Sequence, residues 1–337
     1  MKPPGELQAF LIDHGLAEPD TPVTWTMLSG GVSSDIWRAD LPDRTLCIKR
    51  ALAKLKVQAD WFAPVERNTS EWQWLRFAHG LIPSAVPEVL AHDTQAGLFA
   101  MSFLPPDRYP VWKAQLLSGQ VDCATAQAVG QIMATIHNAS AGKATVARTF
   151  ATGPLFFALR IEPYLLATAK AHQDLAKPLH ALAERTGQTQ LVLVHGDVSP
   201  KNILVGDKAV VLLDAECAWY GEPAFDLAFC LNHLLLKCLV NPGETPGYLA
   251  AFQALKTTYL QAVRWEDALA LGARAASLLP ALLLARVDGK SPVEYLSNER
   301  QRDLVRQVAR PLIQAPPSDL NAVAQGWQAA CSTLLSA

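Results

Sequence analysis

Short apolar runs separated by polar turns fill the N-terminal part of the chain, a pattern typical of β-strands. The apolar runs predict strands at 23–28, 36–40, 45–49, 88–92 and 97–103. Helical spacing of the apolar residues instead predicts helices at 5–16 and at 66–79. Pro105 and Pro106 interrupt the pattern, so this β-rich part is expected to end there.

The rest of the chain has a different pattern, beginning with helical spacing at 124–137. Two short apolar runs, Leu191–Val194 and Val210–Leu213, are the exception and flank a polar loop. We therefore expect an α+β protein with two lobes. The N-terminal lobe, residues 1–104, is small and β-rich, and the C-terminal lobe, residues 105–337, is larger and mainly helical.

The composition narrows the class of function. The chain has 337 residues, half of them hydrophobic, and a formal net charge of −2, so a large core is expected and a nucleic-acid partner is not. A balanced total charge still allows a local basic pocket. The most apolar stretch, Leu278–Ala285, is too short to cross a bilayer, and the six cysteines form no CxxC pair. We expect a soluble, cytoplasmic protein with reduced thiols and no membrane partner.

Residues 195–202 carry the clearest chemical pattern, His-Gly-Asp-Val-Ser-Pro-Lys-Asn. Asp197 opens this loop after an apolar strand, Asn202 follows five residues later, and Asp214 ends the next apolar run. A carboxylate in such a loop can orient a hydroxyl group and accept its proton, and an amide oxygen with a second carboxylate suits Mg²⁺. Either motif alone is commonly a turn or a helix cap. Both together, at this spacing, favour phosphoryl transfer.

These residues resemble a known group of enzymes. The pattern HxDxxxxN, followed by a strand-ending Asp, is similar to the catalytic and metal loops of the protein-kinase-like fold. The His-Gly-Asp form, with Asp214-Ala215-Glu216, resembles the aminoglycoside phosphotransferase and choline kinase superfamily. Residues 220–228 resemble the same superfamily, because they contain Gly-Glu-Pro-Ala-Phe-Asp-Leu-Ala. That superfamily also holds homoserine, fructosamine and methylthioribose kinases.

The resemblance implies a protein-kinase-like two-lobe fold with ATP and Mg²⁺ as cofactors. The acceptor would be a hydroxyl group of a small molecule of the sugar, amino alcohol or riboside class. Residues 1–104 would bind the nucleotide, with a hinge near 101–104. Residues 105–337 would hold the catalytic and metal loops, at 191–228, and the acceptor pocket.

Carried over residue by residue, the resemblance makes Asp197 the catalytic Asp and makes Asn202 and Asp214 the Mg²⁺ ligands. Glu216 resembles an acidic residue that faces the metal in some members, and a salt bridge beside the metal is the alternative for it. His195 resembles a packed structural histidine.

Asp226 resembles a buried residue that braces the catalytic loop.

The nucleotide side of the site is expected in the N-terminal lobe. Residues 29–34 join two predicted strands and resemble a loop that covers phosphates. Their backbone amides and hydroxyl groups could donate to phosphate oxygens, although a Gly-Gly pair between strands is also an ordinary hairpin turn. The loop residues are Ser29, Gly30, Gly31, Val32, Ser33 and Ser34. The loop lacks the form GxxxxGK[ST], which disfavours a P-loop fold.

Lys49 ends an apolar strand and resembles the lysine that contacts the α- and β-phosphates. Glu71 resembles its ion-pair partner, because Trp74 and Leu75 on the next turn place Glu71 on the inner face of the helix. Glu66, one turn earlier, is the rival.

Met101 and Phe103 lie in the segment that resembles the hinge beside adenine.

The acceptor side is expected after the metal-binding Asp. Trp219 and Tyr220 are candidate walls of the pocket, although an aromatic pair could equally belong to the core. Residues 284–292 are expected to form a charged turn in which Arg286 or Lys290 reads an anionic group, or else a solvated loop between helices.

Three alternative functions remain open from the sequence. A protein kinase is disfavoured because Pro223 and Asp226 follow Asp214 closely and leave little room to bind a peptide. A pseudokinase is disfavoured because Lys49, Asp197, Asn202 and Asp214 are all present. An aminoglycoside-modifying enzyme is disfavoured because Asp and Glu are spread thinly from 240 to 337. The identity of the acceptor, the choice between ATP and GTP, and the oligomeric state stay open.

Overall fold

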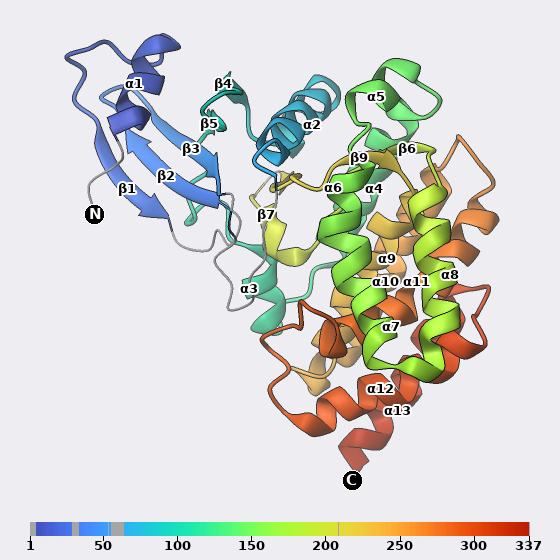
Figure 1. Ribbon diagram of the computed structural model, residues 1–337. Helices are drawn as coiled ribbons and strands as arrows, with labels where there is room; N and C mark the ends of the chain where they lie inside the picture. Colours follow the sequence, from blue (N-terminus) through green and yellow to red (C-terminus); the bar gives the residue numbers. More distant parts are fainter. Residues whose placement is uncertain (1–4, 29–33, 53, 55–63, 208, 337) are drawn as a thin grey trace.

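The computed structural model describes residues 5–28, 34–52, 54, 64–207 and 209–336, the side chains of 333–336 excepted. Its β-rich part and its helical part are separate in space, with the sheet to one side of the helices (Figure 1). The predicted boundary near residue 104 falls between the last strand of this sheet and the next helix. That boundary itself stays a prediction.

The N-terminal part is a five-stranded antiparallel sheet of order β1-β2-β3-β5-β4. Its strands are β1 (Thr24–Leu28), β2 (Ser34–Asp40), β3 (Thr45–Ala51), β4 (Val89–Asp93) and β5 (Leu98–Ser102). All five predicted strands therefore form. Alternate residues of β2 and β3, such as Trp37 and Ile48, are buried together with Leu7 and Phe10 of α1 (Gly5–Asp13). This burial explains why α1 lies beside the strands in Figure 1.

Helices make up most of the remaining chain. The α-helices after β1 are α2 (Arg67–Leu81), α3 (Trp112–Leu117), α4 (Cys123–Ser140), α5 (Ala144–Thr149), α6 (Gly153–Phe156), α7 (Ala167–Ala171), α8 (Ala176–Gln188), α9 (Pro223–Lys237), α10 (Thr245–Ala262), α11 (Ala268–Asp288), α12 (Glu299–Gln314) and α13 (Leu320–Ser336). A π-helix, η2 (Phe157–Leu166), joins α6 to α7. Short 3₁₀ turns are η1 (Pro83–Ala85), η3 (Gln173–Leu175), η4 (Pro200–Asn202) and η5 (Pro242–Glu244).

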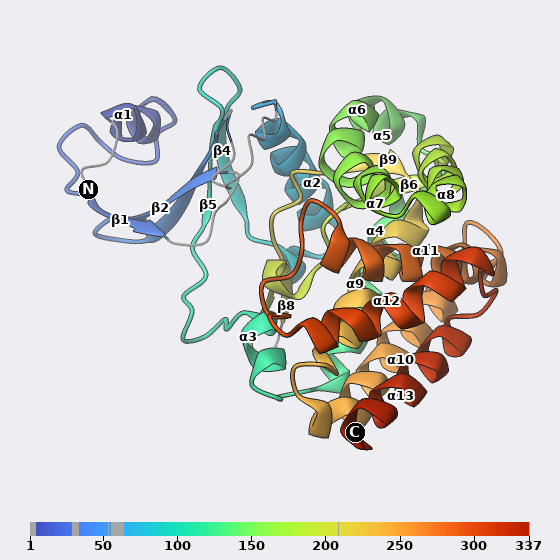
Figure 2. The same cartoon turned by 60° about the horizontal axis from the view of Figure 1, so that its bottom comes forward.

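The centre of the helical part is α9, in which every residue from Pro223 to Lys237 is buried. A helix that is apolar around its circumference is expected to be enclosed by other elements, and α9 lies among α4, α10 and α11 in both views (Figures 1 and 2). Helix α10 approaches α4 closely at Gly130, where an added Cβ atom would lie 2.7 Å from the Leu255 carbonyl oxygen. The core is therefore packed around α9.

Helix α11 corrects two expectations. It runs over 21 residues, from Ala268 to Asp288, and so is long and apolar enough to span a membrane, unlike the shorter stretch read from the sequence. However, 72% of its apolar window is buried inside the protein, as in the core helix of a globular fold. The expected turn at 284–292 begins only at Gly289, so Arg286 is a helical residue.

The predicted polar loop lies between two small sheets. Strand β6 (Val192–Val194) pairs with β9 (Trp219–Gly221), and β7 (Ile203–Val205) pairs with β8 (Val210–Leu212). The two apolar runs that flank the loop thus form strands, but each pairs with another partner. Helix α2 connects this region to the sheet, because Trp74 and Leu75 share one core cluster with β5 and the helical part.

Candidate active site

Asp226, in the first turn of α9, anchors the loop that follows β6. Its two carboxylate oxygens accept hydrogen bonds from the backbone amides of His195 and Gly196, each at 2.8 Å. The His137 ring nitrogen Nε2 lies 3.4 Å from the same carboxylate. Asp226 is fully buried, so these contacts satisfy a charge that would otherwise be costly.

Gly196 is required by the turn itself. Its φ of +79° lies in the left-handed region, and an added Cβ atom would lie 2.7 Å from the Cys217 carbonyl oxygen. His195 bridges the loop to the next strand, since its Nε2 lies 3.1 Å from the Leu213 carbonyl oxygen and its Nδ1 accepts the Asp197 amide at 3.1 Å. His195 is thus buried and in contact with the loop and the next strand, and its structural role stays a prediction.

Asp197 lies at the end of this turn among cations. Its Oδ2 lies 2.9 Å from Arg160 and 3.1 Å from Lys201, and it accepts a hydrogen bond from Asn202 Nδ2 at 2.9 Å. Burial favours the neutral form of the carboxyl group, but Lys201 and Arg160 outweigh burial, so the pKa of Asp197 lies below its ordinary value. Asp197 is therefore an anion near neutral pH.

Arg160 is a site residue that the sequence analysis missed. It comes from η2, and besides Asp197 it donates to the carbonyl oxygens of Gly196, at 2.5 Å, and Leu159, at 2.6 Å. A π-helix over this range changes which residues face the loop, because its turn is wider than that of an α-helix. Pro163 inside an otherwise helical segment was the one signal in the sequence for such an irregularity.

Asp214 follows β8 and has a φ of 66°, the one non-glycine residue with a positive φ in the part of the chain that the structure describes. Such strain is found most often at functional sites. The Leu213 amide donates to the Asn202 carbonyl oxygen at 2.9 Å, which brings the two predicted metal ligands onto adjacent backbone. The Asp214 carboxylate pairs with Lys49 across the two parts of the molecule.

Lys49 also donates to Glu71 Oε2, at 2.6 Å, and both side chains are buried. Glu66, the rival, is exposed just before α2. Burial raises the pKa of Glu71 to about 7, against the effect of Lys49. For Lys49, burial favours the neutral amine, but Asp214 and Glu71 outweigh it and raise its pKa.

Glu216 faces a cation. Its Oε2 lies 3.1 Å from Arg67 Nε, and Arg67 is fully buried at the start of α2. Two roles were expected for Glu216, metal binding and a salt bridge beside the metal ligands. The contact with Arg67 is such a salt bridge. Direct metal binding by Glu216 stays a prediction.

The predicted nucleotide-contacting residues are only partly described. Ser29, Gly30, Gly31, Val32 and Ser33 lie outside the described residues. Ser34 begins β2 and is buried opposite Ala51 of β3.

At the predicted hinge, Met101 is buried in β5 between Cys47 and Val89, whereas Phe103 lies just beyond this strand with Arg38 over its ring at 4.9 Å.

The predicted acceptor residues have structural contacts. Trp219 is buried and stacks on Phe156, with ring centroids 4.5 Å apart, and the Tyr220 hydroxyl accepts the Gly142 amide at 2.9 Å. Arg286 donates to the Tyr164 hydroxyl at 3.0 Å. A role for any of them toward an acceptor stays a prediction.

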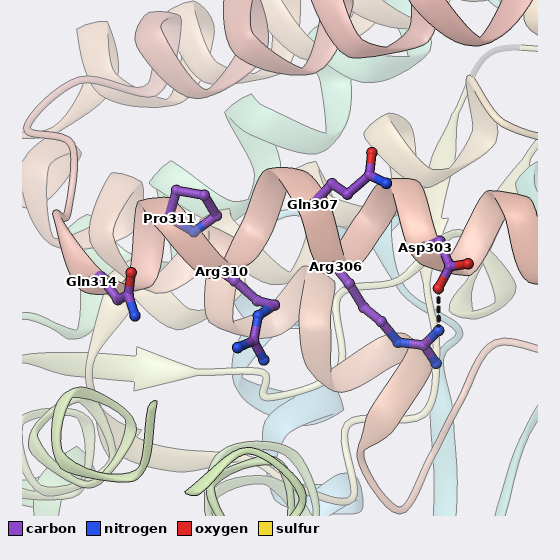
Figure 3. A pocket seen from close by; sticks show the side chains of 6 residues that line it. All are labelled: Asp303, Arg306, Gln307, Arg310, Pro311 and Gln314. Atoms are coloured by element: carbon purple, nitrogen blue, oxygen red, sulfur yellow. Dashed lines mark hydrogen bonds and ion pairs between the residues drawn. The ribbon is translucent and has the colours of Figure 1, made fainter. Parts of the chain in front are cut away.

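Two surface hollows lie apart from the predicted catalytic and metal residues. One, of about 380 Å³, is on α12 and is lined by Arg306 and Arg310, which Figure 3 shows extending from the same side of the helix. Arg306 is already paired with Asp288 and Asp303, and Arg310 with Asp174.

The other hollow, of about 440 Å³, is lined by Phe157, Ile161 and Trp219 among others. None of the predicted catalytic or metal residues lines either hollow.

A metal ion at this site would need few protein ligands. Among the described residues, no three or more His, Cys, Asp and Glu side chains form a metal-binding group. Asn202 uses its amide nitrogen on Asp197, which leaves its oxygen available, and Asp214 supplies a carboxylate beside it. One carboxylate and one amide oxygen, completed by phosphate oxygens, fit Mg²⁺.

Comparison with known proteins gives a family match. The model of the APH phosphotransferase enzyme family matches residues 24–265. Methylthioribose kinase from Yersinia pseudotuberculosis serotype O:1b (strain IP 31758) is 27% identical over 222 residues, which cover 58% of this chain and 54% of that protein. The chain thus spans about half the length of the first curated relatives it matches.

Two solved structures share the fold. Macrolide 2'-phosphotransferase MphH from Brachybacterium faecium has a TM-score of 0.50 at 16% identity, covering 97% of both chains. Amicoumacin kinase hAmiN, solved with AMP-PNP, Ca²⁺ and Ami, has a TM-score of 0.51 at 16% identity, covering 88% of this chain and 90% of that one. Together with the sheet and the helices described above, these likenesses confirm the predicted protein-kinase-like fold.

Proposed function

Because this chain belongs to the APH phosphotransferase enzyme family, we propose that it is a kinase that transfers the γ-phosphate of ATP to a hydroxyl group of a small molecule. The observation that carries the proposal is the set of contacts around Asp197. Its carboxylate is anionic, is oriented by Arg160 and Asn202, and lies next to the strand whose end carries Asp214. A sugar, an amino alcohol or a riboside is the proposed class of acceptor.

In this proposal Asp197 orients the acceptor hydroxyl and takes its proton late in the reaction. Its lowered pKa makes it a weak base, which suits a transition state in which the bond to the leaving group breaks early. Arg160 and Asn202 fix the carboxylate, so the hydroxyl meets an oxygen that is already in position. Asp226 fixes the backbone of the loop at 195–202 by accepting the amides of His195 and Gly196.

ATP and Mg²⁺ are the proposed cofactors. AMP-PNP in the amicoumacin kinase supports nucleotide use, since that protein shares this fold. Asn202 and Asp214 would hold the metal, whose charge would neutralise the phosphate oxygens. Lys49, kept charged by Glu71 and Asp214, would contact the nucleotide phosphates. Ser29, Gly30, Gly31, Val32, Ser33 and Ser34 are proposed to cover them, with Met101 and Phe103 beside the adenine.

The alternatives are less well supported. Aminoglycosides are polycations, whereas Arg160 and Lys201 put positive charge next to Asp197. A protein kinase would need a platform for a peptide, but α9 begins at Pro223, close after Asp214. We place the enzyme in the cytoplasm, where its six free cysteines would stay reduced.

An ADP-release assay with Mg²⁺ and ATP against sugars, amino alcohols, ribosides and aminoglycosides tests the proposal. We expect turnover with one acceptor class and its loss in Asp197→Ala, with nucleotide binding retained. Full activity in Asp197→Ala would remove Asp197 from its role. Absence of both turnover and ATP-Mg²⁺ binding would overturn the kinase assignment.

A further inference from the structure

A group of cations lies at the C-terminal end of α9. His233 and Lys237 are four residues apart on this helix and so share one face. Both contact Tyr295, because His233 Nδ1 lies 3.2 Å from its hydroxyl and Lys237 Nζ lies 3.5 Å from the centre of its ring. Lys113, on α3, lies 6.0 Å from the centre of the same ring, and Arg286, on α11, is among the groups that lower the pKa of His233 after burial. These four residues are called the cationic cluster below.

The cationic cluster is short of anions. Lys113 pairs with Glu294, which is largely exposed. Within the described part of the chain, Lys237 Nζ, Arg286 Nε and His233 Nε2 are buried and have no hydrogen-bond partner. Arg286 Nη1 does donate to the Tyr164 hydroxyl and to the carbonyl and hydroxyl oxygens of Ser291, but these are neutral acceptors. A buried charge held only by neutral groups is costly.

The cationic cluster is connected to Asp197 through Tyr164. The Tyr164 hydroxyl accepts a hydrogen bond from Arg286 at 3.0 Å, and the Arg160 guanidinium lies 5.8 Å from the centre of its ring. Arg160 in turn lies 2.9 Å from Asp197. The cluster is therefore linked to the proposed hydroxyl site through Tyr164 and Arg160, both on η2.

We propose that His233, Lys237 and Arg286 bind an anionic group, a carboxylate or a phosphate, on the acceptor whose hydroxyl is presented to Asp197. This inference rests on the proposed function and adds the substrate class to it: a hydroxy acid or a phosphorylated alcohol. Lys237 Nζ and Arg286 Nε have N–H groups without an acceptor, and protonation of His233 would add another donor, so an oxyanion brought to them can accept hydrogen bonds.

The electrostatics agree with this geometry. Burial lowers the pKa of Lys237 to about 7, and Lys113 adds to the effect. Burial, followed by Arg286 and Lys237, lowers the pKa of His233. A bound anion would favour the charged forms of both groups, and the energy of that interaction is available for binding.

Anion binding tests the inference directly. Inorganic phosphate and D-glycerate are titrated by calorimetry into the full chain with ADP and Mg²⁺ present, so that the nucleotide site is filled. We expect one saturable site, weakened by about 10-fold to 100-fold in Lys237→Met. Lys256→Met is the matched control, because Lys256 is also a buried helical lysine but contacts Asn321 elsewhere.

Binding of neither anion, or equal binding by wild type and Lys237→Met, would overturn the inference. If Lys237→Met does not fold, His233→Gln gives the same comparison. A preference for phosphate or for D-glycerate identifies the anionic group as a phosphate or a carboxylate.

Turnover separates this inference from the proposed function. Matched acceptors, glycerate against glycerol and ribose 5-phosphate against ribose, are compared in the ADP-release assay. Turnover of neutral acceptors only, unchanged in Lys237→Met, would overturn the inference and leave the kinase assignment intact. Saturable anion binding lost in Lys237→Met, without any use of ATP, would support the anion site and contradict the kinase assignment.

Discussion

Two groups of buried cations in this protein differ in one respect. Around the loop at 195–202, each cation has a carboxylate: Lys49 has Glu71 and Asp214, Arg67 has Glu216, and Arg160 has Asp197. At the other end of α9, the buried members of the cationic cluster have aromatic or neutral contacts instead.

This difference distinguishes cations that stabilise the fold from cations that are available to bind a ligand. A cation with a carboxylate is satisfied by the fold itself, so the loop at 195–202 is held ready before a substrate arrives. A buried cation held only by neutral or aromatic groups is stabilised further when a ligand brings an anion, and a lysine such as Lys237 can instead lose its proton. Each of the following substitutions changes one of these two groups of side chains or its carboxylate partners.

The largest effect is expected from Asp197→Asn, which keeps the shape of the side chain but removes its charge. We expect kcat to fall by about 10³-fold, because the hydroxyl loses its oriented proton acceptor. Binding of AMP-PNP, measured by calorimetry, should stay within a few-fold of wild type. A kcat near that of wild type would mean that Asp197 does not act on the hydroxyl.

Arg160→Met should lower kcat by about 10²-fold, because Asp197 loses a positioning contact. The pH profile distinguishes positioning from general destabilisation. Arg160 lowers the pKa of Asp197, so its removal should raise that pKa and move the acidic limb of kcat/KM to higher pH. Loss of activity with an unmoved acidic limb would contradict an electrostatic role for Arg160.

Glu71→Gln acts on the nucleotide side. Lys49 would keep only Asp214 as a carboxylate partner, and we expect the KM for ATP to rise by about 10-fold. The KM for the acceptor should change little. Glu66→Gln is the control, since Glu66 is exposed.

The smallest effect is one of stability, at Lys237. Burial, with the charge of Lys113, lowers the pKa of Lys237 to about 7 in the folded protein, against 10.5 for the free group. Between these values the unfolded chain binds more protons, so the unfolding free energy from this group rises with pH, by at most about 1.4 kcal/mol per pH unit.

Chemical denaturation from pH 7 to pH 10 measures this slope at Lys237. Lys237→Met should remove the slope, whereas Lys256→Met should remove much less. An unchanged slope in Lys237→Met would mean that Lys237 is already charged in the folded protein. The charged or polar neighbours of Lys237 are Lys113, Arg286, His233 and Glu294. They are the same in the wild type and in Lys237→Met.

Sequence alone predicted the parts of the site whose chemistry is local. Asp197 and Asn202 are five residues apart in one loop, so their spacing is visible in the sequence, and the structure joins them by a hydrogen bond. The pairing of Lys49 with Glu71 was predicted from a resemblance, and helix periodicity correctly favoured Glu71 over Glu66 for this contact.

The rest depends on contacts between distant segments. Arg160 reaches Asp197 from η2, which is a π-helix, whereas periodicity arguments assume an α-helix. His233 and Lys237 lie in a helix whose sequence is mostly apolar. Tyr295, which contacts both of them, is far away in the sequence. Strand β9 was missed because three residues are too few to show alternation.

Helix α9 has one further consequence. It carries Asp226, which sets the position of the hydroxyl site, in its first turn, and His233 and Lys237 near its other end. Seven residues of α-helix span about 10 Å, and eleven span about 16 Å. Because α9 is buried along its whole length, its length is fixed. If the cationic cluster binds the anionic group of an acceptor, α9 sets the distance from that group to the proposed hydroxyl site, and we expect selection of acceptors by length as well as by charge.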